Sequence, residues 1–150
     1  MSALLVSDAP PRRSQRRAKV LVAEDHEDTR QLLRTLLEKR GLSVVEAGDG
    51  LEAVGLAVRE CPDLILMDGG LPLLDGIAAT QRLRGLPALS AVPIVFLSGH
   101  AGAPHQAAAR EAGCNEYIVK PFDLARLDTV LNRLLPGHGG HHNEGVIPDA

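Results

Sequence analysis

Short apolar runs alternate with longer amphipathic segments along most of this chain. Five stretches are too short for helices and rich in apolar or β-branched residues, which favours strands; they lie at residues 20–23, 42–47, 64–67, 94–97 and 117–119. The intervening and following segments carry leucine, valine or alanine at helical spacing; they lie at residues 28–40, 51–61, 74–86, 104–112 and 124–134. Because the strands are too apolar to face water on either side, this alternation predicts an α/β fold with helices on both faces of a parallel sheet.

Turn and capping residues mark several of the helix boundaries. Gly41 follows the first predicted helix, as expected of a glycine that ends a helix, and Asp123 is positioned to cap the start of the last one. The second predicted helix carries Leu51, Val54 and Val58 together with the small Gly55.

The composition narrows the class of protein. A chain of 150 residues with 45% hydrophobic content predicts one domain that buries roughly two-thirds of its unfolded surface. The net charge of -3 and the aromatic content of 2% argue against nucleic-acid binding, because they provide neither a basic surface nor rings to stack on bases. Cys61 and Cys114 have no C-x-x-C spacing, so we expect reduced, buried thiols. Without a secretory signal or an apolar run of membrane-spanning length, a cytoplasmic protein is expected.

The two ends of the chain differ in composition from its centre. Residues 1–18 are rich in arginine and proline and predict a flexible basic arm, whereas residues 19–135 carry the alternating pattern of the domain. Residues 136–150 are rich in glycine and histidine and predict a flexible tail, since the histidine spacing does not match a metal site. We therefore expect no output domain after Leu135.

Residues suited to chemistry follow four of the five predicted strands. These are the pair Glu24-Asp25, then Asp68, Ser98 and Lys120. Parallel strands place their carboxyl ends at one edge of the sheet, so we expect these side chains to meet in one crevice. Two like charges ~4 Å apart repel by about 4 kcal/mol at an effective dielectric constant of ~20, and one lysine cannot balance three carboxylates.

A hard divalent cation would complete the charge balance of this crevice. Mg²⁺ suits a site with few protein ligands, because it retains several waters and binds one or two carboxylates together with a phosphate. Carboxylates, Mg²⁺, a lysine and a hydroxyl are the groups that phosphoryl transfer requires, and aspartate can accept a phosphoryl group. We expect Asp68 to be the acceptor, Glu24 and Asp25 to hold the metal, and Lys120 and Ser98 to contact the phosphoryl oxygens.

Taken in order, these motifs resemble those of response-regulator receiver domains of two-component signalling, across residues 19–135. The matching stretches are Glu24-Asp25, the turn Met67-Asp68-Gly69-Gly70-Leu71-Pro72-Leu73-Leu74-Asp75-Gly76, Leu97-Ser98-Gly99, and Tyr117-Ile118-Val119-Lys120-Pro121-Phe122. The resemblance implies a flavodoxin-like, doubly wound five-stranded sheet of order 2-1-3-4-5. It also implies that a histidine kinase or a phosphotransfer protein donates the phosphoryl group to Asp68.

The resemblance further assigns ligands to the metal. It implies Mg²⁺ bound by Asp25, Asp68 and the carbonyl of Gly70, with Glu24 acting partly through water. It also implies a cis peptide bond between Lys120 and Pro121.

The resemblance also implies a conformational switch. Ser98 and Tyr117 would move when Asp68 is phosphorylated and change the surface formed by the fourth helix, fifth strand and fifth helix, through which two copies could also pair. Gly70 and His100 occupy positions that modulate the lifetime of the phosphoryl group in the family. The output would be a change of protein partner, with no role for membranes or nucleic acid.

Two other functions remain open at this stage. A dehalogenase-type phosphatase also uses an aspartate at the end of a strand and Mg²⁺, but it needs a second acid two residues later, where this chain has Gly70. A receiver domain could also serve as a docking module without being phosphorylated. Each site residue alone has a plain structural explanation, such as a helix cap or a turn, and only their combination favours a phosphoacceptor.

Overall fold

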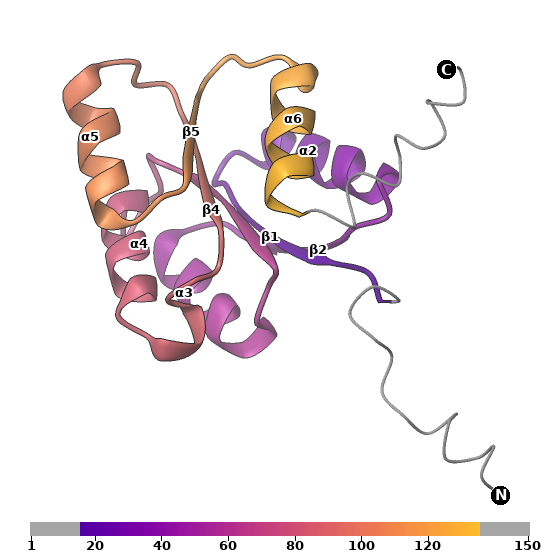
Figure 1. Ribbon diagram of the computed structural model, residues 1–150, viewed down its shortest axis with the longest axis horizontal. Coiled ribbons are helices and arrows are strands. Elements are labelled where there is room, and N and C mark those ends of the chain that lie inside the picture. The colour runs from indigo at the N-terminus through magenta and orange to yellow at the C-terminus, as the bar shows by residue number, and fades with distance from the viewer. Residues whose placement is uncertain (1–15, 136–150) are drawn as a thin grey trace, which may run out of the picture.

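A single parallel sheet forms the centre of the computed structural model, which describes residues 16–135 (Figure 1). The strands are β1 (Lys19–Ala23), β2 (Ser43–Ala47), β3 (Leu64–Asp68), β4 (Ile94–Ser98) and β5 (Glu116–Val119). The helices are α2 (Glu27–Lys39), α3 (Gly50–Glu60), α4 (Gly76–Arg84), α5 (Ala103–Ala112) and α6 (Leu124–Leu134), with a 3₁₀ helix η2 (Pro87–Leu89). The strand order β2-β1-β3-β4-β5 confirms the predicted flavodoxin-like α/β fold.

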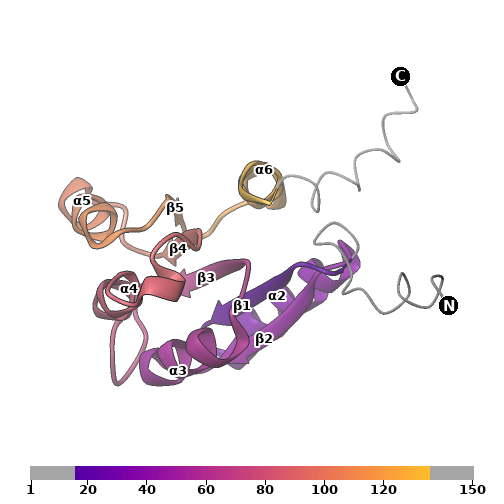
Figure 2. The ribbon, with the colours of Figure 1, turned by 60° about the horizontal axis from the view of Figure 1, so that its bottom comes forward.

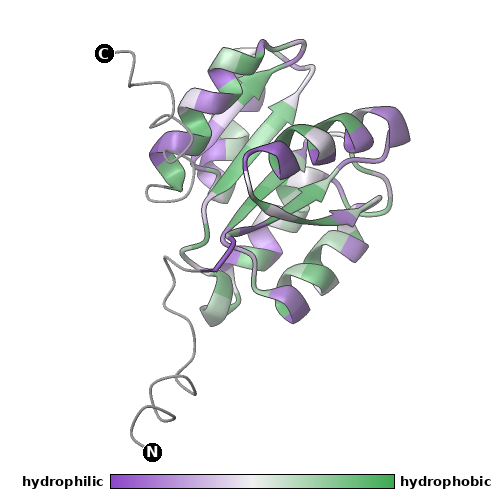
Figure 3. Cartoon of the chain, turned by 90° about the vertical axis from the view of Figure 1, so that its right-hand side faces the viewer, coloured by the Kyte–Doolittle hydropathy of each residue, from purple (hydrophilic) through white to green (hydrophobic). Residues whose placement is uncertain are grey.

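Helices cover the sheet on both faces, and Figure 2 shows the two layers from another side. Helices α2 and α6 pack on one face, whereas α3, α4 and α5 pack on the other. Successive residues of a strand enter opposite layers: Val20 and Val22 of β1 face the first layer, and Leu21 faces the second. This double burial explains why the strands are almost wholly hydrophobic (Figure 3). Each fully buried valine, leucine, isoleucine, methionine or phenylalanine side chain stabilises the fold by about 1.5–3 kcal/mol.

Aspartate side chains cap three of the helices. Asp49, Asp75 and Asp123 accept hydrogen bonds from backbone N–H groups in the first turns of α3, α4 and α6. Such a cap satisfies one of the unpaired N–H groups of a helix start and stabilises it by about 1 kcal/mol. The cap predicted at Asp123 is confirmed. Gly41, with φ +84, follows the C-cap of α2 as predicted.

Helix α4 is shorter than the predicted segment at 74–86. It begins at Gly76, after the cap at Asp75, because Leu73 adopts a positive φ of 67° that is incompatible with a helix. It ends at Arg84, and the chain then forms the separate 3₁₀ helix Pro87–Leu89.

The larger apolar residues of α3 are only partly buried. Leu51 and Val58 are 48% and 54% exposed, and the residues that enter the core are Gly50, Ala53 and Ala57. Glycine is required at position 50 because the start of the helix lies very close to the loop between β3 and α4. An ideal Cβ on Gly50 would lie 1.7 Å from the carbonyl oxygen of Leu74.

The two cysteines are free thiols in different environments. Cys114 is buried, as predicted, and burial raises its pKa. Cys61 is exposed, which corrects the expectation of two buried thiols. It is the C-cap residue of α3 and adopts a left-handed conformation with φ 47.

Predictions about the ends of the chain fall largely outside the structure. The described part contains only the last three residues of the predicted arm at 1–18 and none of the predicted tail at 136–150. Among residues 16–135, no helix has the length and apolar character needed to cross a membrane.

Candidate functional site

Three of the predicted site residues meet at the carboxyl edge of the sheet. Glu24 directly follows β1, Asp68 is the last residue of β3, and Lys120 directly follows β5. The Nζ atom of Lys120 lies 3.0 Å from Oε1 of Glu24 and 3.3 Å from Oδ1 of Asp68. One ammonium group therefore contacts two carboxylates that belong to different strand ends.

The site is a coupled set of mostly buried charges. The residues Glu24 and Asp68 are 1% and 6% exposed. Burial raises the pKa of Asp68 above its ordinary value, and the neighbouring Glu24 charge raises it further against the opposing effect of Lys120. Burial would also raise the pKa of Glu24, but hydrogen bonds from the His26 backbone and from Lys120 outweigh it and lower this pKa.

Lys120 remains a cation in this environment. Burial alone would lower its pKa, but the hydrogen bonds and charges of Glu24 and Asp68 more than compensate, so its pKa is raised. The Lys120-Pro121 peptide bond is cis, which confirms the implied geometry at the end of β5.

Backbone contacts fix the ends of β1 and β3 around these charges. Nη1 of Arg30 donates to the carbonyl of Glu24 at 2.8 Å, and the backbone N–H of His26 donates to Oε2 of Glu24 at 3.1 Å. The N–H of Gly70 points to Oδ1 of Asp68 at 3.4 Å. Helix α4 begins directly against this turn, because an ideal Cβ on Gly76 would lie 2.6 Å from the carbonyl oxygen of Asp68.

The acidic groups are placed to share a cation. One ligand atom from each of Glu24, Asp25, His26 and Asp68 lies within 4.8 Å of every other. Two of these carboxylates are buried while Asp25 is exposed, so one side of the cluster is open to water, as a hydrated Mg²⁺ needs. Gly70 is exposed, and a Cβ placed on it would have no neighbour within 4 Å. The oxygen donors therefore fit the predicted magnesium site.

Ser98 is the last residue of β4 and lies beside residues 69–75, which we call the acceptor turn after the predicted role of Asp68. It is 1% exposed, and its Oγ accepts a hydrogen bond from the backbone N–H of His100 at 3.1 Å. An ideal Cβ on Gly69, the residue after Asp68, would lie 3.2 Å from that Oγ. The carbonyl of Ser98 accepts from the backbone N–H of Lys120 at 2.8 Å, which connects the two residues.

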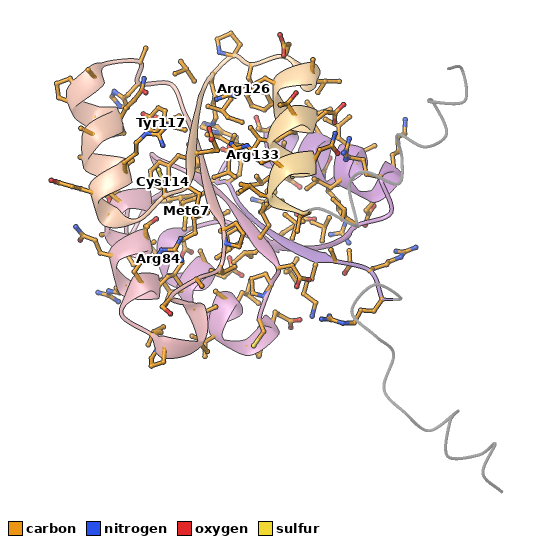
Figure 4. The ribbon with its side chains drawn as sticks, viewed as in Figure 1. Met67, Arg84, Cys114, Tyr117, Arg126 and Arg133 are labelled. Carbon is orange, nitrogen blue, oxygen red and sulfur yellow. The ribbon has the colours of Figure 1, made fainter. Side chains whose placement is uncertain are left out.

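Tyr117 lies between β5 and α5, with its ring buried (Figure 4). Its hydroxyl donates to the backbone carbonyl of His100 at 2.7 Å and contacts Nδ1 of His105 at 2.7 Å. The ring stacks on Phe96, with centroids 5.9 Å apart. The side chain of His100 is exposed.

Sequence reasoning missed two histidines near the site. His26 joins the acidic cluster, and its place directly after Glu24-Asp25 was a usable signal. The His26 pKa is raised, first by the hydrogen bond to Glu24 and then by the charge of Asp25. His105 has no motif around it, since its contact with Tyr117 depends on how α5 packs on β5.

Comparison with known proteins assigns the chain to a family. Residues 20–132 match the family model of the response regulator receiver domain. The polar-differentiation response regulator DivK of Brucella anthropi is 34% identical over 116 residues, which cover 77% of this chain and 94% of DivK. The transcriptional regulatory protein YxdJ of Bacillus subtilis is 35% identical over 133 residues, which cover 86% of this chain but 57% of YxdJ. The chain thus spans little more than half the length of that regulator.

Solved structures agree with this assignment. The receiver domain of the sensor histidine kinase PA1611 from Pseudomonas aeruginosa PAO1, with a magnesium ion coordinated in its active-site cleft, aligns with a TM-score of 0.74 and 34% identity over 79% of this chain and 98% of that one. The chemotaxis protein CheY4 of Vibrio cholerae aligns with a TM-score of 0.75 and 28% identity over 79% and 99%. This chain belongs to the response-regulator receiver domain family of two-component signalling.

Proposed function

We propose that this protein accepts a phosphoryl group on Asp68 from the phosphohistidine of a histidine kinase or phosphotransfer protein. One observation carries the proposal: the ammonium group of Lys120 contacts the carboxylates of both Asp68 and Glu24. A cation in this position can stabilise the negative charge of the carboxylate before transfer and that of the phosphoryl oxygens during transfer.

Each side chain has a distinct role in the proposed transfer. A carboxylate oxygen of Asp68 forms the new bond to phosphorus as the bond from phosphorus to the donor imidazole nitrogen breaks, and the imidazole leaves. Lys120 and Ser98 contact the phosphoryl oxygens. Asp25, Asp68 and the carbonyl of Gly70, with Glu24 partly through water, would hold Mg²⁺, which would supply positive charge near the phosphoryl oxygens.

The output of the proposed reaction is a change of surface. Ser98 and Tyr117 both make hydrogen bonds with the backbone of His100, in the loop between β4 and α5. Movement of Ser98 toward the phosphoryl group would therefore act on the loop, and with it on the face formed by α5, β5 and α6. A change of protein partner at this face, including pairing with a second copy, is the proposed signal. Gly70 and His100 are the proposed tuning positions.

The two other functions have less support. A dehalogenase-type phosphatase would need a second acid two positions after Asp68, where this chain has the exposed Gly70. A docking module that is never phosphorylated would have no need for two buried carboxylates beside one lysine, which is a costly arrangement in a protein interior.

Incubation with acetyl phosphate and Mg²⁺ tests the proposal directly. We expect the intact mass of the protein to increase by one phosphoryl group, and we expect Asp68→Asn to abolish the increase. Asp75→Asn is the matched control, because Asp75 is an exposed aspartate in the same loop and asparagine caps a helix as well as aspartate does. Absence of a mass increase in the unmodified protein, or its persistence in Asp68→Asn, would contradict the proposal.

A further inference from the structure

The hydroxyl of Tyr117 has two partners but only one proton. Both contacts are 2.7 Å long, one to the carbonyl oxygen of His100 and one to Nδ1 of His105. A carbonyl oxygen can only accept, so the tyrosine proton must be donated to His100. The second contact is then a hydrogen bond only if Nδ1 of His105 carries a proton and donates it to the phenol oxygen. The geometry therefore selects the form of His105 that is protonated at Nδ1.

The imidazole of His105 connects three parts of the molecule. It projects from the first turn of α5 and meets the ring of Tyr117 edge to face, with centroids 5.9 Å apart and an interplanar angle of 74°. It stacks on the imidazole of His100, with centroids 4.5 Å apart. Its Cε1 atom also lies 3.7 Å from the position of an ideal Cβ on Gly69, the residue after Asp68. One side chain of α5 thus contacts the buried tyrosine and the loop after β4, and it lies close to the residue that follows Asp68.

We propose that His105 is the positioning residue that holds Tyr117 in its buried orientation. The Nδ1–H group donates to the phenol oxygen and so directs the phenol proton to the carbonyl of His100. Because His105 belongs to α5, the orientation of Tyr117 and the position of this helix are coupled through one hydrogen bond. The relevance of this coupling to signalling rests on the proposed function, but the hydrogen bond itself does not.

A role in simple packing is the alternative, and isosteric substitutions separate the two. Asparagine and leucine have nearly the same shape, but only asparagine has an N–H group at the position of the histidine Nδ1. His105→Asn therefore retains the donor, whereas His105→Leu removes it with little change in volume. A positioning role predicts that His105→Asn keeps Tyr117 buried better than His105→Leu does, whereas a packing role predicts no such advantage for asparagine.

Tyrosine fluorescence measures the outcome at this one residue. The chain contains one tyrosine and no tryptophan, so its emission reports on Tyr117 alone. In protein without phosphate donor or Mg²⁺, we expect His105→Leu to shift the ratio of exposed to buried tyrosine about fivefold, seen as stronger quenching by acrylamide. We expect His105→Asn to remain close to the unmodified protein. Equal quenching in the two variants would overturn the proposal.

A second measurement tests whether the effect passes through the phenol oxygen. Tyr117→Phe keeps the ring and removes the acceptor, so the advantage of His105→Asn over His105→Leu in urea midpoint should decrease in this background. A difference that is the same in both backgrounds would assign the effect to packing and helix propensity and would overturn the proposal. Should His105→Leu fail to fold, His105→Phe, which keeps a ring without a donor, replaces it in both comparisons.

These experiments remain informative if the proposed function fails. They use unphosphorylated protein, so a missing mass increase on Asp68 would leave the hydrogen bond of His105 standing. Conversely, a normal mass increase with equal quenching in the two variants would leave the phosphoacceptor intact and remove the role of His105.

Discussion

Asp68 and Glu24 are two buried carboxylates that share one positive partner, Lys120. At a separation of ~4 Å and an effective dielectric constant of ~20, two carboxylates repel by about 4 kcal/mol, and one ammonium offsets only part of this. The pKa of Asp68 is raised and that of Glu24 is lowered, so the charged form of Asp68 is the less favourable of the two. The charged form of Asp68 is therefore destabilised by its surroundings in the folded protein.

Removal of this charge should stabilise the protein at neutral pH. Folding raises the pKa of Asp68, so protonated Asp68 favours the folded state. This contribution to stability is fully present below the pKa of Asp68 in the unfolded chain, and it is lost as pH rises through the higher pKa of the folded protein. We expect Asp68→Asn to increase the free energy of unfolding by about 1 kcal/mol at neutral pH. The increase should shrink as pH falls below the raised pKa, where Asp68 is itself neutral.

Urea unfolding over a range of pH, without divalent cations, measures this effect. Asp75→Asn again serves as the control, since Asp75 is exposed and its capping role tolerates asparagine. A loss of stability in Asp68→Asn at neutral pH, or a gain in stability that grows toward low pH, would show that the charge on Asp68 does not destabilise the folded protein.

Individual residues differ in how far their roles can be predicted from sequence. The proximity of Glu24, Asp68 and Lys120 was predictable, because each directly follows an apolar run and parallel strands bring such ends together. The opposite pKa shifts of the two carboxylates were not predictable, because they depend on contacts with His26 and Lys120. The same holds for the contact between His105 and Tyr117, which joins a helix to a strand.

At the scale of elements, the start of α4 controls the shape of the acceptor turn. The backbone N–H of Gly76 donates to the carbonyl of Gly69 at 3.3 Å, and the cap at Asp75 fixes the first turn of the helix. A side chain on Gly76 would collide with the backbone of Asp68 and with the side chain of Met67. This glycine lets a helix pack directly against the residue that we propose as the phosphoryl acceptor.

Two glycine-to-alanine substitutions in helices should consequently have opposite effects. Gly76→Ala should lower the free energy of unfolding by about 1–3 kcal/mol, because a Cβ 2.6 Å from the Asp68 carbonyl oxygen forces the backbone to move. Gly55→Ala, in α3, should raise it by about 0.5–1 kcal/mol, since Gly55 is exposed and its Cβ would meet nothing within 4 Å.

Urea unfolding measures the stability of the two variants. The rate of labelling by acetyl phosphate shows whether a substitution also disturbs the turn that carries Asp68. We expect slower labelling in Gly76→Ala alone. Stabilisation by both substitutions would mean that α4 can withdraw from the acceptor turn without cost.

The same close contacts explain where the prediction of elements was incomplete. Strand positions followed from hydrophobicity, because every strand is covered on both faces. The buried side of α3 did not, because Ala53 and Ala57 pack against the sheet while the larger Leu51 and Val58 remain exposed. Packing distance, which decides this choice, has no simple counterpart in the periodicity of the sequence.

At the scale of the whole molecule, folding creates the cation site. Glu24 and Asp25 follow β1 while Asp68 ends β3, and only the paired strands bring their oxygen atoms within 4.8 Å of one another. An unfolded chain has no such cluster, so a cation that binds the native site stabilises the native state by mass action. The effect should be large here because bound charge would also relieve the repulsion between the acids.

Mg²⁺ should therefore raise the melting temperature of the protein. At a concentration ten times the dissociation constant, binding stabilises the fold by about 1.4 kcal/mol, which for a domain of this size corresponds to roughly 3–6 °C. Asp25→Asn should remove most of this increase, because Asp25 supplies the exposed carboxylate of the cluster. Glu27→Gln, at an exposed acid two residues later, should retain it. Thermal unfolding followed by circular dichroism, with KCl at matched ionic strength, separates binding from screening. An equal increase in both variants would place the cation outside the cluster at the carboxyl ends of β1 and β3.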